Sequence, residues 1–256
     1  MPELLDTRYL SAIKLRREEI ASFADYPFCI PAVKKLKRLE FHPAVTFLVG
    51  ENGIGKSTLI EAIAIKMGFN AEGGSRNLQF DTRSSHSELH NYITLERGVR
   101  RPRDGYFLRA ESFYNLATQL EQLDSFPAKA PPLINSYGGH SLHEQSHGES
   151  FFSLLLHRLG GDGFYIFDEP EAALSPNRQL SALALIHRLV RRRSQLIIST
   201  HSPILMAYPD AQIYVLTEKG IKKTTFTETE HFTITRDFLN RHKMMLKVLL
   251  EEEPEE

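Results

Sequence analysis

Nine consecutive residues, from Gly50 to Thr58, have the types and the spacing needed to hold a phosphate group. They read Gly-Glu-Asn-Gly-Ile-Gly-Lys-Ser-Thr and match the phosphate-loop pattern G-x-x-x-x-G-K-[ST] at every fixed position. The backbone N–H groups of such a loop can surround a phosphate, and the N-terminus of the helix after it adds partial positive charge. The residues predicted to bind a nucleotide are Glu51, Asn52, Gly53, Ile54, Gly55, Lys56, Ser57 and Thr58.

Two side chains of this loop are predicted to take part in the chemistry. Lys56 would reach the β- and γ-phosphates of ATP, and the Ser57 hydroxyl would bind Mg²⁺. The apolar run Val45–Val49 before the loop predicts a buried strand, and Ser57–Met67 after it predicts a helix. This strand–loop–helix context is what the pattern requires.

A second block supplies carboxylates. Phe164–Phe167 is an apolar, aromatic run that predicts a buried parallel strand, and Asp168 and Glu169 follow it directly. A side chain at the carboxyl end of such a strand faces the ligand crevice of an open α/β sheet. We therefore expect Asp168 to hold Mg²⁺ together with Ser57, and Glu169 to accept a proton from the attacking water.

A third block places a histidine just after another strand. The run Gln195–Ser199 predicts a strand that neighbours the Asp168 strand, and Thr200-His201-Ser202-Pro203 follows it. The imidazole of His201 would then reach the γ-phosphate. The predicted catalytic residues are thus Lys56, Glu169 and His201.

Together with Ser146-His147-Gly148-Glu149, these blocks resemble the ABC-type ATPase superfamily in its soluble SMC-like and OLD-like branch. Ser146 and Gly148 match the signature motif of that superfamily, and Ser146 precedes Asp168 by 22 residues while His201 follows it by 33. Glu171 and the Thr-His-Ser-Pro run favour the OLD-like branch over transporters. The flanks around Pro27 and over Ile234–Leu239 resemble stand-alone bacterial predicted ATPases of the AAA family, so the resemblance covers nearly the whole chain.

The resemblance implies a fold, cofactors and partners. The fold would be an α/β P-loop NTPase of the ABC-ATPase-like kind, a three-layer sandwich with a small β/helical lobe. The cofactors would be ATP and Mg²⁺, with Ser146, Gly148 and Glu149 bound to the ATP of a second copy. ATP would therefore drive a homodimer that works as a switch in DNA repair or phage defence, with nucleic acid or an effector protein as a further partner.

Two departures from the pattern leave alternatives open. The superfamily has a glutamine-bearing loop after the next strand, and here Glu111 and Gln79 are both candidates for that position. An aromatic residue to stack on adenine has no clear equivalent. The alternative function, a nucleotide-binding subunit of an ABC transporter, is weakened by both departures.

His143-Glu144-Gln145-Ser146-His147 also fits the zinc-protease pattern H-E-x-x-H. That chemistry needs both histidines on one face of a continuous helix. Gly138 and Gly139 before the stretch and Gly148 after it argue against such a helix. We therefore favour the signature motif, which also explains Ser146.

The composition is that of a globular enzyme. Hydrophobic residues make up 41% and charged residues 25% of the 256, and the net charge is −1. The sequence predicts a single ABC-type ATPase domain over residues 1–256. With Cys29 as its only cysteine the chain can form no internal disulfide, and no apolar run is long enough to span a membrane. A cytoplasmic location without membrane attachment is expected.

The remaining elements are predicted around these anchors. Residues 70–103 are polar and predict a partly ordered insertion, and 112–160 predict a helical signature region. Two basic clusters, one at 34–38 and one at 97–103, fit either a solvated face or a track for a phosphate backbone. Further expected elements are strands at 9–15, 36–41 and 105–110, a hairpin at 212–226, helices at 177–193 and 235–250, and an acidic tail at 251–256.

Overall fold

The computed structural model describes residues 8–76, 86–111 and 147–250, and between the last two ranges the single positions 113, 118, 124, 132, 134, 135 and 139. Within these residues a seven-stranded sheet has the order β10-β9-β3-β8-β7-β6-β4. The five inner strands are parallel and the two edge strands antiparallel to their neighbours. The strands are β3 (Val45–Val49), β4 (Gly74–Ser75), β6 (Asp104–Arg109), β7 (Gly163–Asp168), β8 (Gln195–Ser199), β9 (Gln212–Thr217) and β10 (Gly220–Thr224).

The burial of the three central strands explains why their apolar runs predicted them correctly. Every residue of β3, β7 and β8 is buried, as expected of parallel strands that are covered by helices on both faces. As predicted, β8 lies between β3 and β7. The carboxyl ends of these strands, which precede the phosphate loop, Glu169 and His201, therefore meet at one edge of the sheet.

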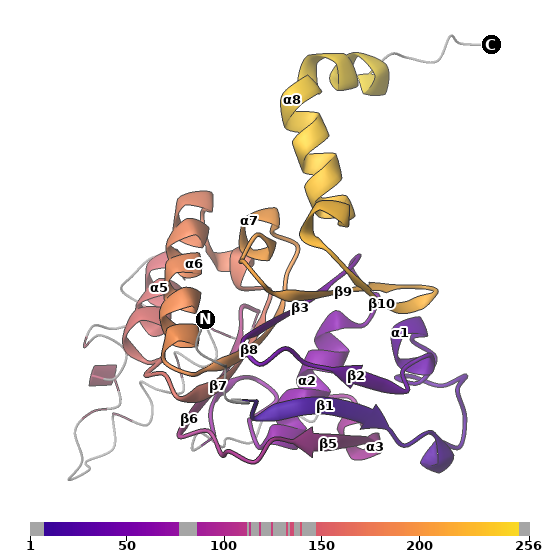
Figure 1. Ribbon diagram of the computed structural model, residues 1–256, viewed down its shortest axis with the longest axis vertical. Helices are drawn as coiled ribbons and strands as arrows, with labels where there is room; N and C mark the ends of the chain where they lie inside the picture. Colours follow the sequence, from indigo (N-terminus) through magenta and orange to yellow (C-terminus); the bar gives the residue numbers. More distant parts are fainter. Residues whose placement is uncertain are drawn as a thin grey trace.

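A second, three-stranded antiparallel sheet forms the small lobe. Its order is β2-β1-β5, with β1 (Leu10–Leu15), β2 (Arg38–Glu40) and β5 (Ile93–Arg97). Two short helices belong to this side of the molecule, α1 (Pro31–Lys34) and α3 (Leu89–Tyr92). The small β-containing lobe that was expected beside the P-loop fold is thus present (Figure 1).

Helices on both faces of the large sheet complete the layers. α2 (Lys56–Met67) lies between the two sheets and is apolar on several sides, with Leu59, Ile60 and Ile63 fully buried. The opposite face is covered by α5 (His147–His157), α6 (Pro176–Arg191) and α7 (Pro203–Met206). Figure 1 shows these helices on one side of the sheet and α2 on the other.

One buried amide joins the two sheets. The Gln195 Oε1 atom at the start of β8 accepts hydrogen bonds from the backbone N–H groups of Tyr9 and Leu10, both at 2.9 Å. Its Nε2 atom donates to the carbonyls of Leu10 at 2.8 Å and His42 at 3.0 Å. A single polar side chain therefore satisfies the backbone where the small sheet begins to lie against the large one.

Part of the expected insertion at residues 70–103 contains regular structure. Its second half contains α3 and β5, and β5 pairs with β1 over most of its length. Leu89 and Ile93 are fully buried in the core between the sheets. The short alternation of Ile93 and Leu95 with polar residues is the signal that indicates this strand.

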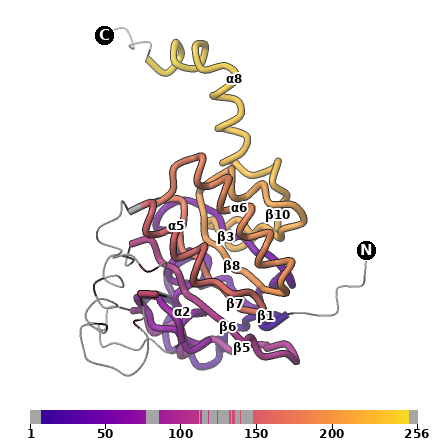
Figure 2. Tube along the Cα trace, turned by 90° about the vertical axis from the view of Figure 1, so that its left-hand side faces the viewer, coloured from indigo at the N-terminus to yellow at the C-terminus, as the bar shows by residue number. Residues whose placement is uncertain are grey.

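The C-terminal helix begins earlier than expected and leaves the body of the molecule. α8 spans Glu230–Leu250, with non-helical backbone angles at Arg241, and none of its residues is buried. Figures 1 and 2 show it extending away from the sheets. No helix within the described part of the chain is long and apolar enough to cross a membrane.

The other expected elements lie where the sequence predicted them or outside the described residues. The hairpin is β9–β10, and the helix expected at 177–193 is α6. In the signature region α5 is described, and Phe113 packs edge-on against Phe151 at 5.4 Å between ring centroids. Most of 112–146, and the tail at 251–256, fall outside the described ranges.

Candidate nucleotide-binding site

The phosphate loop joins β3 to α2 and needs glycine at two positions of close approach. A side chain on Gly50, which has a φ of 149°, would place its Cβ 2.5 Å from the carbonyl oxygen of Leu216. A side chain on Gly55, with a φ of 102°, would place its Cβ 2.6 Å from the Ile30 side chain. Both positions also have positive φ angles, which glycine adopts at low cost. Gly55 is the residue that caps the N-terminus of α2.

The rest of the predicted loop residues lie around this turn. Glu51, Asn52 and Gly53 are exposed at its tip, and Ile54 is half-buried. Thr58 lies in the first turn of α2. The structure therefore brings together all eight loop residues predicted to bind the nucleotide.

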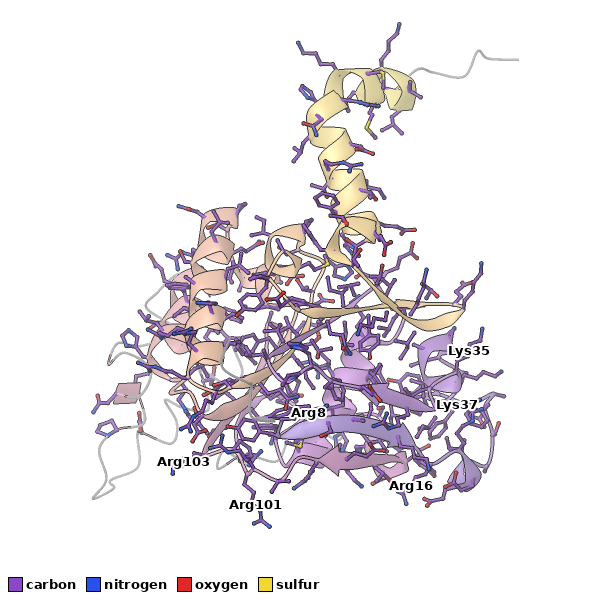
Figure 3. The ribbon with its side chains drawn as sticks, in the orientation of Figure 1. Arg8, Arg16, Lys35, Lys37, Arg101 and Arg103 are labelled. Carbon is purple, nitrogen blue, oxygen red and sulfur yellow. The ribbon has the colours of Figure 1, made fainter. Side chains whose placement is uncertain are left out.

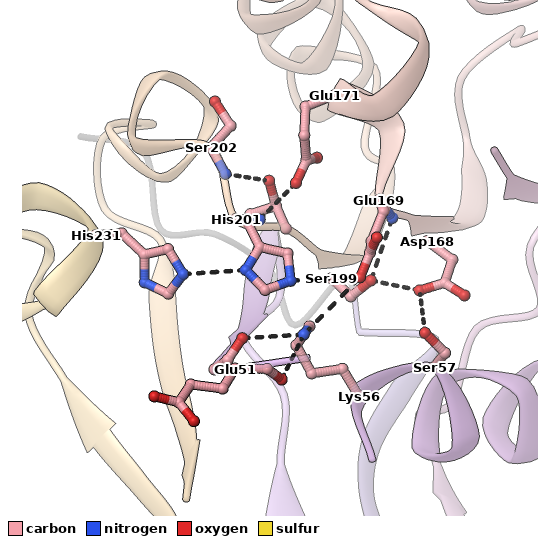
Figure 4. Close-up of polar contacts among 12 residues, drawn as sticks. Glu51, Lys56, Ser57, Asp168, Glu169, Glu171, Ser199, His201, Ser202 and His231 are labelled. Atoms are coloured by element: carbon pink, nitrogen blue, oxygen red, sulfur yellow. Dashed lines mark hydrogen bonds and ion pairs between the residues drawn. The ribbon is translucent and has the colours of Figure 1, made fainter. Parts of the chain in front are cut away.

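Lys56 is held inside the loop. Its side chain is only 3% exposed, and its Nζ atom donates to the carbonyls of Gly50 and Glu51, each at 2.9 Å. The Glu169 Oε1 atom lies 3.8 Å from Nζ (Figure 4). Burial lowers the pKa of Lys56, and the charges of Glu169 and Asp168 oppose that shift. The ammonium group is thus oriented by two carbonyls before any phosphate arrives.

Asp168 ends β7 beside two hydroxyl groups. Its Oδ1 atom accepts hydrogen bonds from Ser57 at 3.2 Å and from Ser199 at 2.5 Å. The carboxyl group is 4% exposed, and burial raises the pKa of Asp168. A hydroxyl and a carboxylate are hard oxygen donors, and Mg²⁺ typically takes one or two such protein ligands and completes its shell with phosphates and water. The pair Ser57–Asp168 therefore fits the metal that the sequence implied.

A largely buried arginine provides a positive charge next to Asp168. Arg109, the last residue of β6, places its Nε atom 3.3 Å from Asp168 Oδ2 and its Nη1 atom 2.8 Å from Glu61 Oε2. Burial opposes the charge of this guanidinium, but the hydrogen bond that it donates to Glu61 and the negative charges around it outweigh burial and raise the pKa of Arg109. Arg109 thus bridges the Asp168 carboxylate to α2.

Glu169 has an uncommon backbone. Its φ and ψ are 51° and 52°, the left-handed region that non-glycine residues rarely adopt. The conformation is supported by hydrogen bonds from its N–H group to the Ser199 carbonyl at 3.1 Å and to the Ser199 hydroxyl at 3.2 Å. Its carboxylate points toward Lys56 and His201 (Figure 4). Such strain is common where a side chain must be aimed at a reacting group.

His201 lies at the same edge of the sheet, as predicted. Its Nε2 atom is 3.4 Å from Glu169 Oε1 but is buried without a hydrogen-bond partner among the described residues. Its backbone N–H donates to Glu171 Oε1 at 2.5 Å, and its Nδ1 atom lies 3.2 Å from Nε2 of His231. The predicted catalytic residues Lys56, Glu169 and His201 therefore converge.

The signature residues lie elsewhere. Gly148 is in α5, and a Cβ on it would come within 2.9 Å of the Ala173 carbonyl. Arg178 of α6 donates to the Gly148 carbonyl at 2.5 Å and lies 3.4 Å from Glu149. These contacts attach the start of α5 to α6 and to the segment after Glu169. Ser146 falls outside the described residues.

The structure describes one of the two candidates for the glutamine-loop position. Glu111 is exposed two residues after the end of β6, and Gln79 falls outside the described residues, as do positions 143–146 of the rival zinc pattern. In the described part of the chain no group of three or more His, Cys, Asp or Glu residues is arranged to hold a metal ion.

Four residues of the site were missed from the sequence: Arg109, Ser199, Glu171 as a contact of His201, and His231. The strand register explains the first two, because Arg109 is the register partner of Asp168 on one side and Ser199 is its partner on the other. Polar residues at the ends of neighbouring apolar strands are the signal that could have indicated them. Nothing in the sequence around His231 points to the site.

Two family models match separate parts of the chain. One, described as "AAA domain", matches residues 14–122, which include the phosphate loop. The other, described as "AAA domain, putative AbiEii toxin, Type IV TA system", matches residues 150–207, which include Asp168, Glu169 and His201. No curated protein matches the sequence.

Several solved structures resemble the chain at low identity. The SMC head domain from Thermotoga maritima is 17% identical with a TM-score of 0.43, over 84% of this chain and 98% of that one. The cbiO1 protein from Clostridium perfringens, part of the ABC transporter complex cbiONQ, is 17% identical with a TM-score of 0.47, over 93% and 97%. An ATP-binding cassette of an ABC transporter is 17% identical with a TM-score of 0.45, over 81% and 89%.

Proposed function

We propose that this chain, a P-loop ATPase of the ABC and SMC-like type, binds ATP with Mg²⁺, hydrolyses it slowly and works as an ATP-driven dimerising switch. The observation that carries the proposal is the convergence of Lys56, Glu169 and His201 beside the pair Ser57–Asp168. A phosphate cradle, a metal-binding pair, a carboxylate base and an imidazole donor are the groups that phosphoryl transfer to water requires.

Each group has one task in the proposed reaction. The loop N–H groups and Lys56 hold the phosphates, and Ser57 and Asp168 hold Mg²⁺. The metal, when bound, neutralises charge on the transferring phosphoryl group. Glu169 accepts the proton of the attacking water, and the Nε2–H group of His201 donates to a γ-phosphate oxygen. Glu169 and His201 are already neighbours, so the water and the phosphate would meet between them.

The test separates binding from turnover. Lys56→Ala should lose nucleotide binding, because Nζ is the buried cation of the loop. Glu169→Gln should keep ATP binding and lose most turnover, because the amide cannot accept the proton. Binding is measured by titration calorimetry and turnover by phosphate release. Unchanged ATP affinity in Lys56→Ala would contradict the phosphate-loop assignment.

The proposed dimer would complete each site with residues of a second copy. Ser146, Gly148 and Glu149 would bind the ATP held by the partner, and the contacts of Gly148 and Glu149 with α6 support a role away from the phosphate loop of their own chain. Such an arrangement is symmetric and contains two sites. Glu169→Gln with saturating ATP should sediment as a dimer and with ADP as a monomer, and adding Ser146→Arg should abolish the dimer. A Glu169→Gln variant that stays monomeric in ATP would contradict the switch.

Nucleic acid is the partner we favour, because basic residues gather on the small lobe. Figure 3 labels six of them around the small sheet and its connections: Arg8, Arg16, Lys35, Lys37, Arg101 and Arg103. A cavity of about 510 Å³ beside β5 is lined by Arg76, Arg97, Arg100 and Arg101, and the described residues that line it include no carboxylate. Guanidinium groups without carboxylates suit the oxygen atoms of a phosphate backbone.

Salt dependence tests this partner. Wild-type protein should bind fluorescent duplex DNA or RNA with an affinity that falls as salt increases. The triple change of Arg97, Arg100 and Arg101 to Ala should weaken binding and reduce that salt dependence. A matched triple change of Arg191, Arg241 and Lys243 to Ala removes the same charge from α6 and α8. If wild type binds neither nucleic acid, an effector protein is the remaining partner class.

The wider setting of the proposal follows from the resemblance. The switch would act in the cytoplasm, in DNA repair or phage defence. The alternative, a nucleotide-binding subunit of an ABC transporter, would be supported if the protein were recovered in a membrane fraction bound to a permease.

A further inference from the structure

His201 is contacted from two opposite sides of its ring. Nε2 faces Glu169, with 3.4 Å to Oε1, and Nδ1 faces Nε2 of His231 at 3.2 Å. The two imidazole rings are tilted by 50° with centroids 5.4 Å apart. His231 is the second residue of α8, so the helix that leaves the body of the molecule touches the nucleotide site at its first turn (Figure 4).

The contact between the rings constrains where the protons lie. A hydrogen bond between two neutral imidazoles needs one N–H donor and one acceptor. If Nδ1 of His201 were the donor, its Nε2 atom would carry a lone pair directed at the Glu169 carboxylate, and the two negative ends would repel. If Nε2 of His231 is the donor, Nε2 of His201 carries the proton and faces the carboxylate favourably.

We propose that His231 is a positioning residue, which donates from Nε2 to Nδ1 of His201 and so fixes the tautomer that presents an Nε2–H group to the γ-phosphate. The inference rests on the proposed function, since it assigns a task to His231 in the same site. This role would make the first turn of α8 part of the ATP-hydrolysing site. Neither the phosphate loop nor the pair Asp168-Glu169 implies such a role for α8.

The environment of the pair supports this direction of donation. Burial, and then the neighbouring His201 and Lys56, lower the pKa of His231, so that it is neutral near pH 7 and holds a single ring proton. The Nε2 atom of His201 is buried and lacks a hydrogen-bond partner among the described residues, which leaves its proton available for a substrate oxygen. The Glu171 carboxylate holds the His201 backbone, and the ring is oriented separately through Nδ1.

The tautomer can be read directly by NMR. In protein labelled with ¹⁵N-histidine and without nucleotide, the ring nitrogens of His201 should show the Nε2-protonated form, assigned by comparison with His201→Ala. In His231→Ala the His201 signals should move toward a mixture of tautomers. An Nδ1-protonated His201 in wild type, or an unchanged spectrum in His231→Ala, would overturn the proposal.

Kinetics provide the second measurement. His231→Ala should lower kcat about 10- to 100-fold, the range for outer partners that orient a functional imidazole. KM for ATP and the affinity for ADP should stay near wild type. His231→Gln should recover part of kcat, because its amide can donate at a similar position. His242→Ala is the matched control, since His242 is an exposed histidine of the same helix.

The outcomes distinguish this inference from the proposed function. If wild type hydrolyses ATP and His231→Ala does so equally well, the positioning role fails and the ATPase proposal stands. If wild type does not hydrolyse ATP at all, the ATPase proposal fails, and the NMR measurement alone decides the tautomer. Loss of ADP binding in both His231 variants would show a purely structural contact and would overturn the inference.

Discussion

At the residue scale, the site depends on buried charges that neutralise one another. Arg109 touches the carboxylates of both Asp168 and Glu61, and all three side chains are largely buried. Removing one member of a buried ion pair usually costs far more than removing an exposed one, because the remaining charge stays in a medium that solvates it poorly. We therefore expect Arg109 to contribute to folding stability as well as to the position of the Asp168 carboxylate, which we propose binds Mg²⁺.

We predict that Arg109→Met lowers the free energy of unfolding by about 3–5 kcal/mol, as expected for a buried carboxylate pair left without its cation. Urea unfolding followed by circular dichroism measures this. Arg38→Met is the control, because Arg38 also bonds two carboxylates, Glu96 and Glu40, but is exposed. Equal and small losses in the two variants would contradict a structural role for Arg109.

A second prediction concerns acid stability. Burial opposes ionisation of Asp104, but Arg158 and hydrogen bonds from Tyr165 and Gly160 outweigh it and lower the pKa of Asp104. A carboxyl group with a lowered pKa stabilises the folded state above its unfolded pKa of about 3.9, and this contribution disappears as the pH falls through the lower folded value.

Asp104→Asn should therefore destabilise the protein at pH 7. The difference from wild type should shrink once the pH falls below about 4. Chemical denaturation at a series of pH values measures this difference in the free energy of unfolding. A difference that stays constant from neutral to acid pH would mean that Asp104 acts through hydrogen bonding alone and not through its charge.

At the scale of elements, one buried side chain of the large sheet holds the backbone where the small sheet begins. Gln195 makes four hydrogen bonds to the backbone of Tyr9, Leu10 and His42. An apolar replacement would leave buried backbone groups without partners, and each such group costs about 1–3 kcal/mol. The attachment of β1 to β8 should thus be sensitive to this one side chain.

Gln195→Leu should lower the free energy of unfolding by about 2–4 kcal/mol and reduce the hydrogen-exchange protection of β1 more than that of β7. Gln212→Leu is the comparison, since Gln212 is only partly buried and also bonds a backbone carbonyl. Uniform loss of protection over both sheets would show that they unfold as one unit.

At the scale of the whole molecule, the body and α8 differ in how many of their residues are buried. None of the residues in α8 is buried, and several apolar side chains along it are exposed, among them Leu239, Val248 and Leu249. The backbone at Arg241 departs from helical angles. Segments with few buried contacts open at low free-energy cost.

We predict that amides after Arg241 exchange with deuterium much faster than those of β8, which is buried along its whole length. The first turn of α8, around His231, should exchange more slowly than the end of the helix because it contacts the nucleotide site. Mass-spectrometric exchange at the peptide level measures both. Protection of residues 242–250 equal to that of β8 would contradict the prediction.

Sequence patterns were sufficient to predict the parts of this protein whose information is local. The phosphate loop, the Asp168-Glu169 pair and His201 each lie within a few residues of an apolar strand, so their patterns could be recognised and the strands β3, β7 and β8 predicted. Because parallel strands bring their carboxyl ends to one edge, these residues could also be expected to meet.

Only the tertiary structure decided which distant residues join them. Arg109 and Ser199 lie beside Asp168 because of the register of three strands, and a shift of one residue would turn those side chains to the other face. The place of β5 in the small sheet depends on pairing with β1, far away in the sequence. His231 reaches His201 because α8 starts against the edge of the large sheet, a contact for which no local pattern exists.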